Sequence, residues 1–157
     1  PLVADLLRDN GVSVMVRRVH ELPRYAEDEV DLPFRIPKQL EDEGVLYCLQ
    51  NAGDMEHMGT RNLPFYAGTA HAYGLTYEQA VRSVTLNAAR ILGIDDQCGS
   101  IETGKDATLF ISEGDALDMM TNRLSHAFIQ GRSIDLDNRQ RALYRKFQNK
   151  YGAPILD

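Results

Sequence analysis

The chain has 157 residues, of which 43% are hydrophobic and 25% charged, and its formal net charge is −6 at pH 7. This composition is that of an ordinary globular protein and predicts a packed core without extensive disorder. The acidic balance argues against general affinity for nucleic acid or anionic lipid, because both kinds of binding depend mainly on Lys and Arg. No apolar run approaches the roughly 18 residues of a membrane span. We therefore expect neither nucleic acid nor a membrane as a partner.

Two runs in the first part of the chain have the length and composition of strands. Val12–Val16 is rich in β-branched residues and follows Gly11, which can adopt the left-handed conformation that ends a helix. Val45–Gln50 is a nearly continuous apolar run, which is typical of a parallel strand covered on both faces. The two runs predict neighbouring parallel strands.

Helix signals lie before, between and after these runs. Leu6 and Leu7 belong to a helix-like pattern, and Pro37 can open a short helix that continues through Glu43. A further helix is expected to begin after Asn62, with proline in its first turn and glycine at its end. The order helix, strand, helix, strand, helix predicts two β/α units.

Beyond Gly74 the pattern changes. Thr76–Gln79 has the spacing of a capping box and predicts a helix that buries residues such as Ala80. Ala107–Ile111 and His126–Gln130 are predicted to be strands joined by hairpin-like connections, with a third strand over residues 133–135. Two cysteines, one in a predicted strand and one in a predicted turn, are expected to be free thiols and indicate no redox compartment.

The last helix is predicted to begin after Asp137 or Asn138. Leu143, Phe147 and Tyr151 recur every four residues and form one apolar stripe. The same helix carries several Lys and Arg residues and no acid. We expect its basic side chains to be a solvated face of a helix that covers the preceding strands.

Three segments in this order, Asn62–Thr76, Thr85–Ile94 and Gly99–Ile111, resemble the amidohydrolase family near its imidazolonepropionase-like members. The resemblance implies an α/β fold in which a (β/α)8 barrel carries a metal centre and a small β-sandwich is built from both ends of the polypeptide. A complete barrel needs roughly 250 residues. The resemblance therefore implies that residues 1–94 are the C-terminal part of the barrel, its last two β/α units. Residues 95–157 would be C-terminal sandwich strands followed by a terminal helix.

The chemistry of the family is implied in the same way. A divalent metal, most commonly zinc, lowers the pKa of a bound water so that hydroxide can attack a carbonyl or related carbon. The family's histidine ligands lie on earlier strands, which this chain does not contain. An aspartate at the end of the eighth strand contacts the metal and transfers a proton, and that strand corresponds to Val45–Gln50. We expect the isolated chain to bind no metal and to be inactive.

The acid of the family is assigned to Asp54, which lies shortly after this strand. Asn51 stands where the simplest family pattern places the acid, and an amide cannot take a proton from water. We therefore predict that Asp54 is the catalytic residue and metal contact of the intact enzyme, and that Asn51, His57 and Arg61 contact the substrate. A solvated loop remains an alternative for His57 and Arg61.

An independent metal site is a further alternative for this loop. Asp54, Glu56 and His57 are three possible ligands in four residues, but such clusters are common by chance. The other histidines, His20, His71 and His126, show no ligand spacing and are expected to be packed or on the surface.

The leading hypothesis is the C-terminal part of an enzyme that hydrolyses a C–N bond in a small molecule, such as a cyclic amide, an amidine-like ring or a dipeptide. Two alternatives are a non-catalytic interaction or ligand-binding module and a pseudoenzyme with Asn51 in place of the acid. Two barrel units leave strand edges open, and we expect Val14, Val16, Val45 and Leu49 to be exposed. The predicted consequence is a homo-oligomer, most simply a two-fold dimer.

Overall fold

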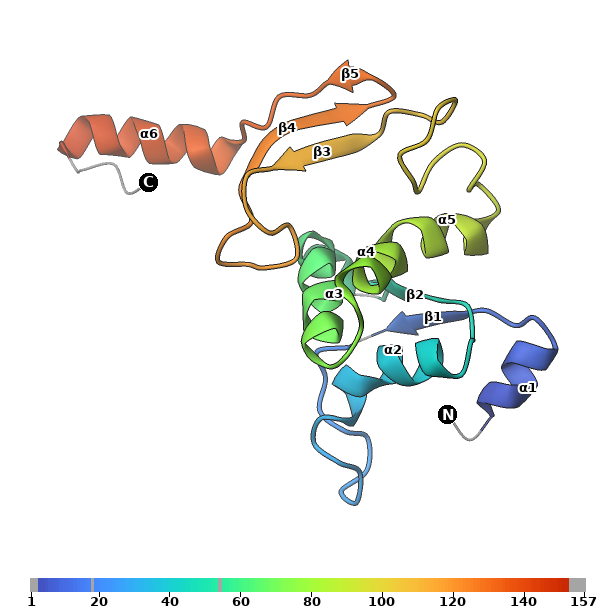
Figure 1. Cartoon of the computed structure of the whole chain (residues 1–157). Coiled ribbons are helices and arrows are strands. Elements are labelled where there is room, and N and C mark those ends of the chain that lie inside the picture. Colours follow the sequence, from blue (N-terminus) through green and yellow to red (C-terminus); the bar gives the residue numbers. More distant parts are fainter. Residues whose placement is uncertain (1–2, 18, 54, 153–157) are drawn as a thin grey trace.

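The computed structural model describes residues 3–17, 19–53 and 55–152, which form a mixed α/β structure (Figure 1). Its elements, in chain order, are α1 (Ala4–Asp9), β1 (Val14–Arg17), α2 (Leu32–Asp42), β2 (Tyr47–Gln50), the 3-10 helix η1 (Glu56–Asn62), α3 (Leu63–Ala72), α4 (Tyr77–Val84), α5 (Leu86–Leu92), β3 (Leu109–Ser112), β4 (Leu124–Ile129), β5 (Arg132–Ser133) and α6 (Arg139–Tyr151). No helix among the described residues is long and apolar enough to cross a membrane.

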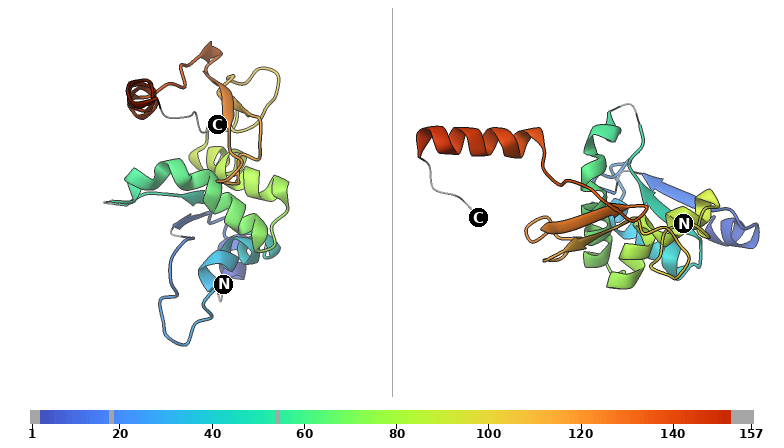
Figure 2. Two further views of the ribbon diagram at one scale, coloured as in Figure 1. Left: turned by 90° about the vertical axis from the view of Figure 1, so that its left-hand side faces the viewer. Right: turned by 90° about the horizontal axis from the view of Figure 1, so that it is seen from above.

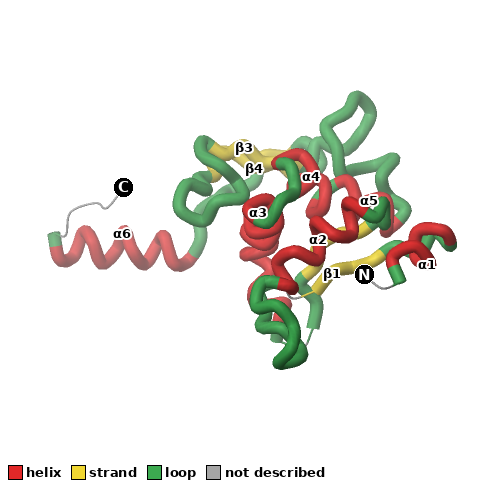
Figure 3. The backbone as a smooth tube through the Cα atoms, turned by 60° about the horizontal axis from the view of Figure 1, so that its bottom comes forward, coloured by secondary structure: helices red, strands yellow, loops and turns green. Residues whose placement is uncertain are grey.

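The strands β1 and β2 form a parallel pair, as the sequence predicts. Val14 lies opposite Tyr47, and Arg17 lies opposite Gln50. Parallel strands need a crossover connection, and α2 provides it. Because the two strands are parallel, their carboxyl ends lie at the same end of the pair. Figure 3 shows β1 with the helices α2 and α3 beside it.

The core lies on the face of this pair that α2, α3 and α4 cover. Side chains alternate along a strand, so Val16, Tyr47 and Leu49 point to this face and are 8%, 0% and 2% exposed. The prediction that Val14, Val16, Val45 and Leu49 are exposed is therefore wrong, because Val45 is buried as well and Val14 packs against the core. The opposite face is the more open one and is called the open face below: Met15 is 48% and Leu46 37% exposed there, although Cys48, which lies opposite Met15, is buried.

The helix α2 begins earlier than the sequence predicts. It starts at Leu32, has Pro33 in its first turn and contains Pro37 in its interior. Proline lacks a backbone N–H and therefore removes one hydrogen bond of the helix. Pro37 is fully buried, and its packing together with Leu40 offsets that loss. The end of the helix at Gly44, with φ of +69°, agrees with the prediction.

Both cysteines are free thiols, as predicted. Cys48 is buried in β2, and burial raises the pKa of its thiol. Cys98 is half-buried in the connection after α5.

The strands β3, β4 and β5 form a separate antiparallel sheet, and Figures 1 and 2 show α4 and α5 between this sheet and the β1–β2 pair. Leu109 lies opposite Phe128, which in turn lies opposite Ser133. Gly131, with φ of +76°, makes the tight turn between β4 and β5. The predicted hairpin connection is confirmed, although β5 is shorter and begins one residue earlier than expected.

The terminal helix α6 extends away from the rest of the chain in Figures 1 and 2. It begins after Asn138, whose Oδ1 accepts a hydrogen bond from the backbone N–H of Arg141 at 2.9 Å. None of its residues is buried. The apolar stripe is present, but the expectation that α6 covers the preceding strands is wrong, because Leu143, Phe147 and Tyr151 are 40%, 48% and 69% exposed.

Candidate functional site

The last residues of β1 and β2 on the open face are polar. Arg17 and Gln50 lie opposite each other in the last register position, one step beyond Met15 and Cys48. The Gln50 Oε1 accepts a hydrogen bond from the backbone N–H of Ala52 at 2.6 Å, and this bond turns the chain directly after the strand. The open face thus changes from apolar to polar toward the strands' carboxyl ends.

His20 follows β1 and is held by residues of two helices. Its ring packs edge-on against Phe34 of α2 at 6.1 Å and Tyr66 of α3 at 4.6 Å between ring centroids. Its Nε2 lies 2.6 Å from the Thr69 Oγ1. The Thr69 hydroxyl donates its own proton to the Phe65 carbonyl at 3.0 Å. Because that hydroxyl has only one proton, the His20 Nε2 must be the donor of the His20–Thr69 bond.

The bond to Thr69 fixes the tautomer of the neutral His20 ring. With Nε2 protonated, Nδ1 carries the lone pair whenever the ring is neutral. Partial burial lowers the pKa of His20, which favours the neutral form near pH 7. His20 can therefore accept a hydrogen bond or a proton at Nδ1.

Asn51 comes directly after β2 and is half-buried. Its side-chain amide nitrogen is buried and has no hydrogen-bond partner among the described residues. Gly59 of η1 lies against it, since a Cβ added to Gly59 would be 3.1 Å from the Asn51 Nδ2 and 3.9 Å from the Tyr66 hydroxyl. Asn51, Gly59, Tyr66 and His20 therefore form one continuous cluster at the strands' carboxyl ends.

Two hollows meet at His20. One of about 950 Å³ lies between the end of β1, the following loop and the start of α2, and its lining includes Arg17, Arg24 and Asp28. The other, of about 490 Å³, is lined by residues that include Phe34, Thr69 and Tyr73. Both share His20, Glu21 and Leu22. The sequence prediction treated His20 as packed or surface because it has no ligand spacing. Its place after a strand was the signal that could have identified it.

The structure describes the other predicted site residues, Asp54, His57 and Arg61, only in part. Asp54 lies outside the described residues, and so does the side chain of His57, whose backbone belongs to η1. Arg61 also belongs to η1 and is exposed, and it does not line either hollow. Of the four predicted residues, Asn51 is the one that the described part of the chain brings into the His20 cluster.

The remaining histidines, His71 and His126, lie outside the His20 cluster. The Nδ1 of His71 lies 2.7 Å from the Leu75 carbonyl oxygen, and His126 lies in β4 of the other sheet. Within residues 3–17, 19–53 and 55–152, no group of three His, Cys, Asp or Glu residues could hold a metal ion.

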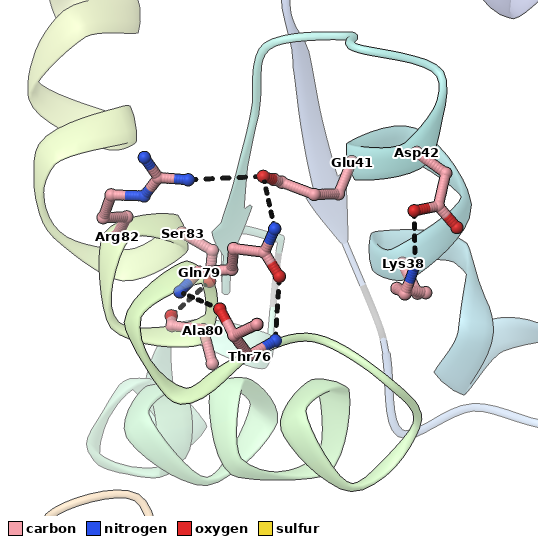
Figure 4. Close-up of polar contacts among 8 residues, drawn as sticks. All are labelled: Lys38, Glu41, Asp42, Thr76, Gln79, Ala80, Arg82 and Ser83. Atoms are coloured by element: carbon pink, nitrogen blue, oxygen red, sulfur yellow. Dashed lines mark hydrogen bonds and ion pairs between the residues drawn. The ribbon is translucent and has the colours of Figure 1, made fainter.

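A different polar cluster lies near the amino end of β2 (Figure 4). The Glu41 carboxylate at the end of α2 accepts hydrogen bonds from the Gln79 Nε2 at 3.0 Å and the Arg82 Nη2 at 3.2 Å, both on α4. Gln79 also completes the predicted capping box with Thr76. Burial, followed by the charge of Glu41, raises the pKa of Tyr47. This cluster ties α2 to α4 beside the core.

The sequence model of the amidohydrolase family matches residues 36–137, from α2 through β5. The chain belongs to the amidohydrolase family. The match contains the whole of β2, η1 and α3, and therefore Asn51 and the predicted residues Asp54, His57 and Arg61.

Solved structures of amidohydrolases are similar to this chain. An amidohydrolase from Thermotoga maritima MSB8 is 26% identical with a TM-score of 0.67, and the similarity covers 85% of this chain and 34% of that one. A prolidase complexed with N-methylphosphonate-L-proline is 18% identical with a TM-score of 0.63, covering 85% and 37%. The chain thus spans about a third of the length of the Thermotoga maritima amidohydrolase. No curated protein matches it in sequence.

Proposed function

We propose that the chain is the C-terminal part of a metal-dependent hydrolase that cleaves a C–N bond in a small molecule. The family match over residues 36–137 carries this proposal. The parallel β1–β2 pair supports it, because barrel enzymes place their active sites at the carboxyl ends of the strands. His20 and Asn51 lie at those ends.

In this proposal β1 and β2 are the last two strands of a (β/α)8 barrel. Residues 1–94 complete the barrel, and residues 95–157 contribute β3, β4, β5 and the terminal helix to a small β-sandwich. The open face with Met15 and Leu46 is then the side that faces the barrel interior. Its change from apolar residues to Arg17 and Gln50 toward the carboxyl ends is the pattern that such an interior requires.

A divalent metal, zinc foremost, belongs to this proposal for the intact enzyme. The described residues do not fit a complete metal site, because they contain no group of three ligands and Asn51 offers only an amide. The ion would be held by histidines of earlier strands, with Asp54 as the contribution of this chain. We therefore derive no reaction step through the metal.

The roles of this chain's own residues follow from their chemistry. Asp54 would take the proton from water and pass it to the leaving nitrogen, which is general acid–base work. The Asn51 amide and the His20 ring would contact the substrate at the strand ends, and His57 and Arg61 would contact it from η1. A cyclic amide, an amidine-like ring or a dipeptide offers both donors and acceptors to these groups.

The decisive experiment compares variants of the intact parent enzyme. Asp54→Asn should lower kcat by about a hundredfold or more, the order expected for loss of a general acid–base group. Asp96→Asn, in an exposed turn after α5, is the matched control and should leave kcat unchanged. If Asn51→Ala proves damaging while Asp54→Asn is mild, the acid has been assigned to the wrong residue. Chelator-sensitive turnover by the 157-residue chain alone would contradict its proposed role as one part of the site.

A second candidate function rests on the unpartnered amide of Asn51. A buried polar group without a hydrogen bond costs free energy unless a ligand satisfies it. If Asn51 replaces the acid, the parent would be a pseudoenzyme or a non-catalytic binding module. Metal analysis of the purified parent separates the two, because a hydrolase should contain stoichiometric metal and lose activity when the metal is removed.

A further inference from the structure

The helix α6 exposes an apolar stripe without packing it against the described body of the chain. Leu143, Phe147 and Tyr151 are 40%, 48% and 69% exposed, and the rings of Phe147 and Tyr151 stack with centroids 6.3 Å apart. No residue of the helix is buried, and Figure 2 shows it standing apart in both views. Contiguous exposed apolar side chains of this kind mark interaction surfaces.

The helix is held in its helical form by local contacts. Asn138 caps its first turn, and the Arg145 guanidinium binds both carboxylate oxygens of Asp137, at 3.0 and 2.5 Å. Gly152 ends it in the left-handed conformation, with φ of +62°. These contacts favour a preformed helix, which reduces the ordering cost of binding a partner.

Charge is segregated between α6 and the rest of the chain. Of the 17 Lys and Arg residues, five lie on α6, whereas none of the 23 Asp and Glu residues does. The five are Arg139, Arg141, Arg145, Lys146 and Lys150. Because the whole chain has a net charge of −6, the body without α6 is strongly acidic. A basic helix and an acidic body on the same chain are complementary between two copies.

We propose that α6 docks on the acidic body of a second copy of this chain, which forms a two-fold dimer by exchange of the helix. Pairing of α6 with the α6 of the other copy is disfavoured, because each carries five positive charges and no negative ones. This inference does not depend on the proposed enzymatic function.

The connection between β3 and β4 is the receiving surface. Met119 and Met120 are 66% and 87% exposed there. Glu113, Asp115 and Asp118 leave the connection negatively charged, although Arg123 pairs with Glu113 at 3.4 Å. Methionine side chains adapt well to the surface of a partner. The connection thus combines exposed apolar groups with charge opposite to that of α6.

Contacts with α3 and α4 hold this connection in place. Leu117 is buried, and its carbonyl oxygen lies so close to Gly68 of α3 that a Cβ there would be 2.2 Å away. The Tyr77 hydroxyl of α4 donates to the Asp115 carboxylate at 2.9 Å. The surface around Met119 and Met120 is therefore presented by an anchored loop.

Sedimentation velocity of the 157-residue chain tests the proposal first. The mass derived for the wild type should be twice the monomer mass of 17.6 kDa. Raising the salt concentration should shift the monomer–dimer equilibrium toward monomer. Leu143→Ala/Phe147→Ala and Lys146→Glu/Lys150→Glu should both raise the dimer dissociation constant at least tenfold with unchanged circular dichroism. Ile101→Ala, at a residue 88% exposed and outside α6, is the control and should remain dimeric.

Carbodiimide cross-linking identifies the surface that α6 occupies. The reagent joins lysine amines directly to carboxylates, and a mixture of ¹⁴N- and ¹⁵N-labelled chains distinguishes links between copies from links within one copy. We expect mixed-isotope links from Lys146 or Lys150 to Glu113 or Asp118. A monomer at all concentrations, or a dimer that the α6 variants leave intact, would overturn the proposal. So would a monomer that binds phosphatidylserine vesicles through α6, which would make the helix a membrane contact.

Discussion

The two ends of the β1–β2 pair differ in how their polar side chains are hydrogen-bonded. Near the amino end of β2, Glu41 lies between Gln79 and Arg82, and the three side chains join α2 to α4 (Figure 4). At the carboxyl ends, His20 borders two hollows and the Asn51 amide nitrogen has no partner among the described residues. In the barrel arrangement proposed above, the first end would contribute stability and the second would carry function. Substitutions at the two ends should therefore affect different properties.

The two faces of the same strands extend this comparison. Leu49 is 2% exposed and packs on the helices, whereas Met15 on the open face is 48% exposed. Leu49→Ala should lower the free energy of unfolding by about 2–5 kcal/mol, the usual cost of emptying a packed site. Met15→Ala should cost less than about 1 kcal/mol in the same urea titration, because its side chain packs on one side only. Equal losses at the two positions would mean that another part of the structure covers the open face.

The polar cluster near the amino end of β2 gives the next largest effect. Glu41 is 20% exposed, and Glu41→Ala would leave Arg82 and Gln79 without their shared acceptor. We expect a loss of about 1–3 kcal/mol in the free energy of unfolding, the cost of unpaired buried polar groups. Glu43→Ala, at an exposed position after the same helix, is the control and should change stability by less than about 0.5 kcal/mol. A Glu41 variant as stable as the control would reduce this cluster to a surface contact.

Local signals predicted most of the elements of this structure. The capping box at Thr76 is present with both of its hydrogen bonds, and Gly44 follows the end of α2 with positive φ. These features depend on neighbours within a few residues, so the sequence is sufficient to find them. The same holds for the cap of Asn138 on α6.

Contacts between elements distant in sequence were predicted less well. The sequence could not show that α2, α3 and α4 cover the face of β1 and β2 that contains Val16 and Leu49, because period-two alternation does not say which face has a partner. It also placed the start of α2 at Pro37, where packing of a buried proline overrides a helix-breaking preference. His20 was missed for a related reason, since Tyr66 and Thr69, which hold it, are distant in sequence.

The capping box allows a smaller and more local test of the framework. The Thr76 Oγ1 accepts from the Gln79 backbone N–H at 3.2 Å, and the Gln79 side chain accepts from the Thr76 backbone N–H at 2.8 Å. Thr76→Ala should lower the free energy of unfolding by about 1 kcal/mol. Asn62→Ala provides the matched control, because Asn62 is the N-cap of α3 but makes no side-chain cap bond. A loss at Asn62 as large as that at Thr76 would show that the cap bond is not the source of the effect.

The smallest expected effect concerns protonation of His20 at the carboxyl end of β1. Partial burial lowers the pKa of His20, so the unfolded chain binds a proton there more readily than the folded chain. Stability from this group is thus fully present above the unfolded pKa of about 6.5 and is lost as pH falls through the lower folded value. Urea titrations at pH 7.5 and pH 5.5 should show a smaller decrease in stability for His20→Gln than for the wild type. NMR titration of the His20 ring gives a direct check, with a folded pKa below 6.5 expected. Glu21 and Asp28 line the same hollow, so a folded pKa above 6.5 would mean that their negative charge outweighs the loss of hydration, and the ring at this end would be charged near neutral pH.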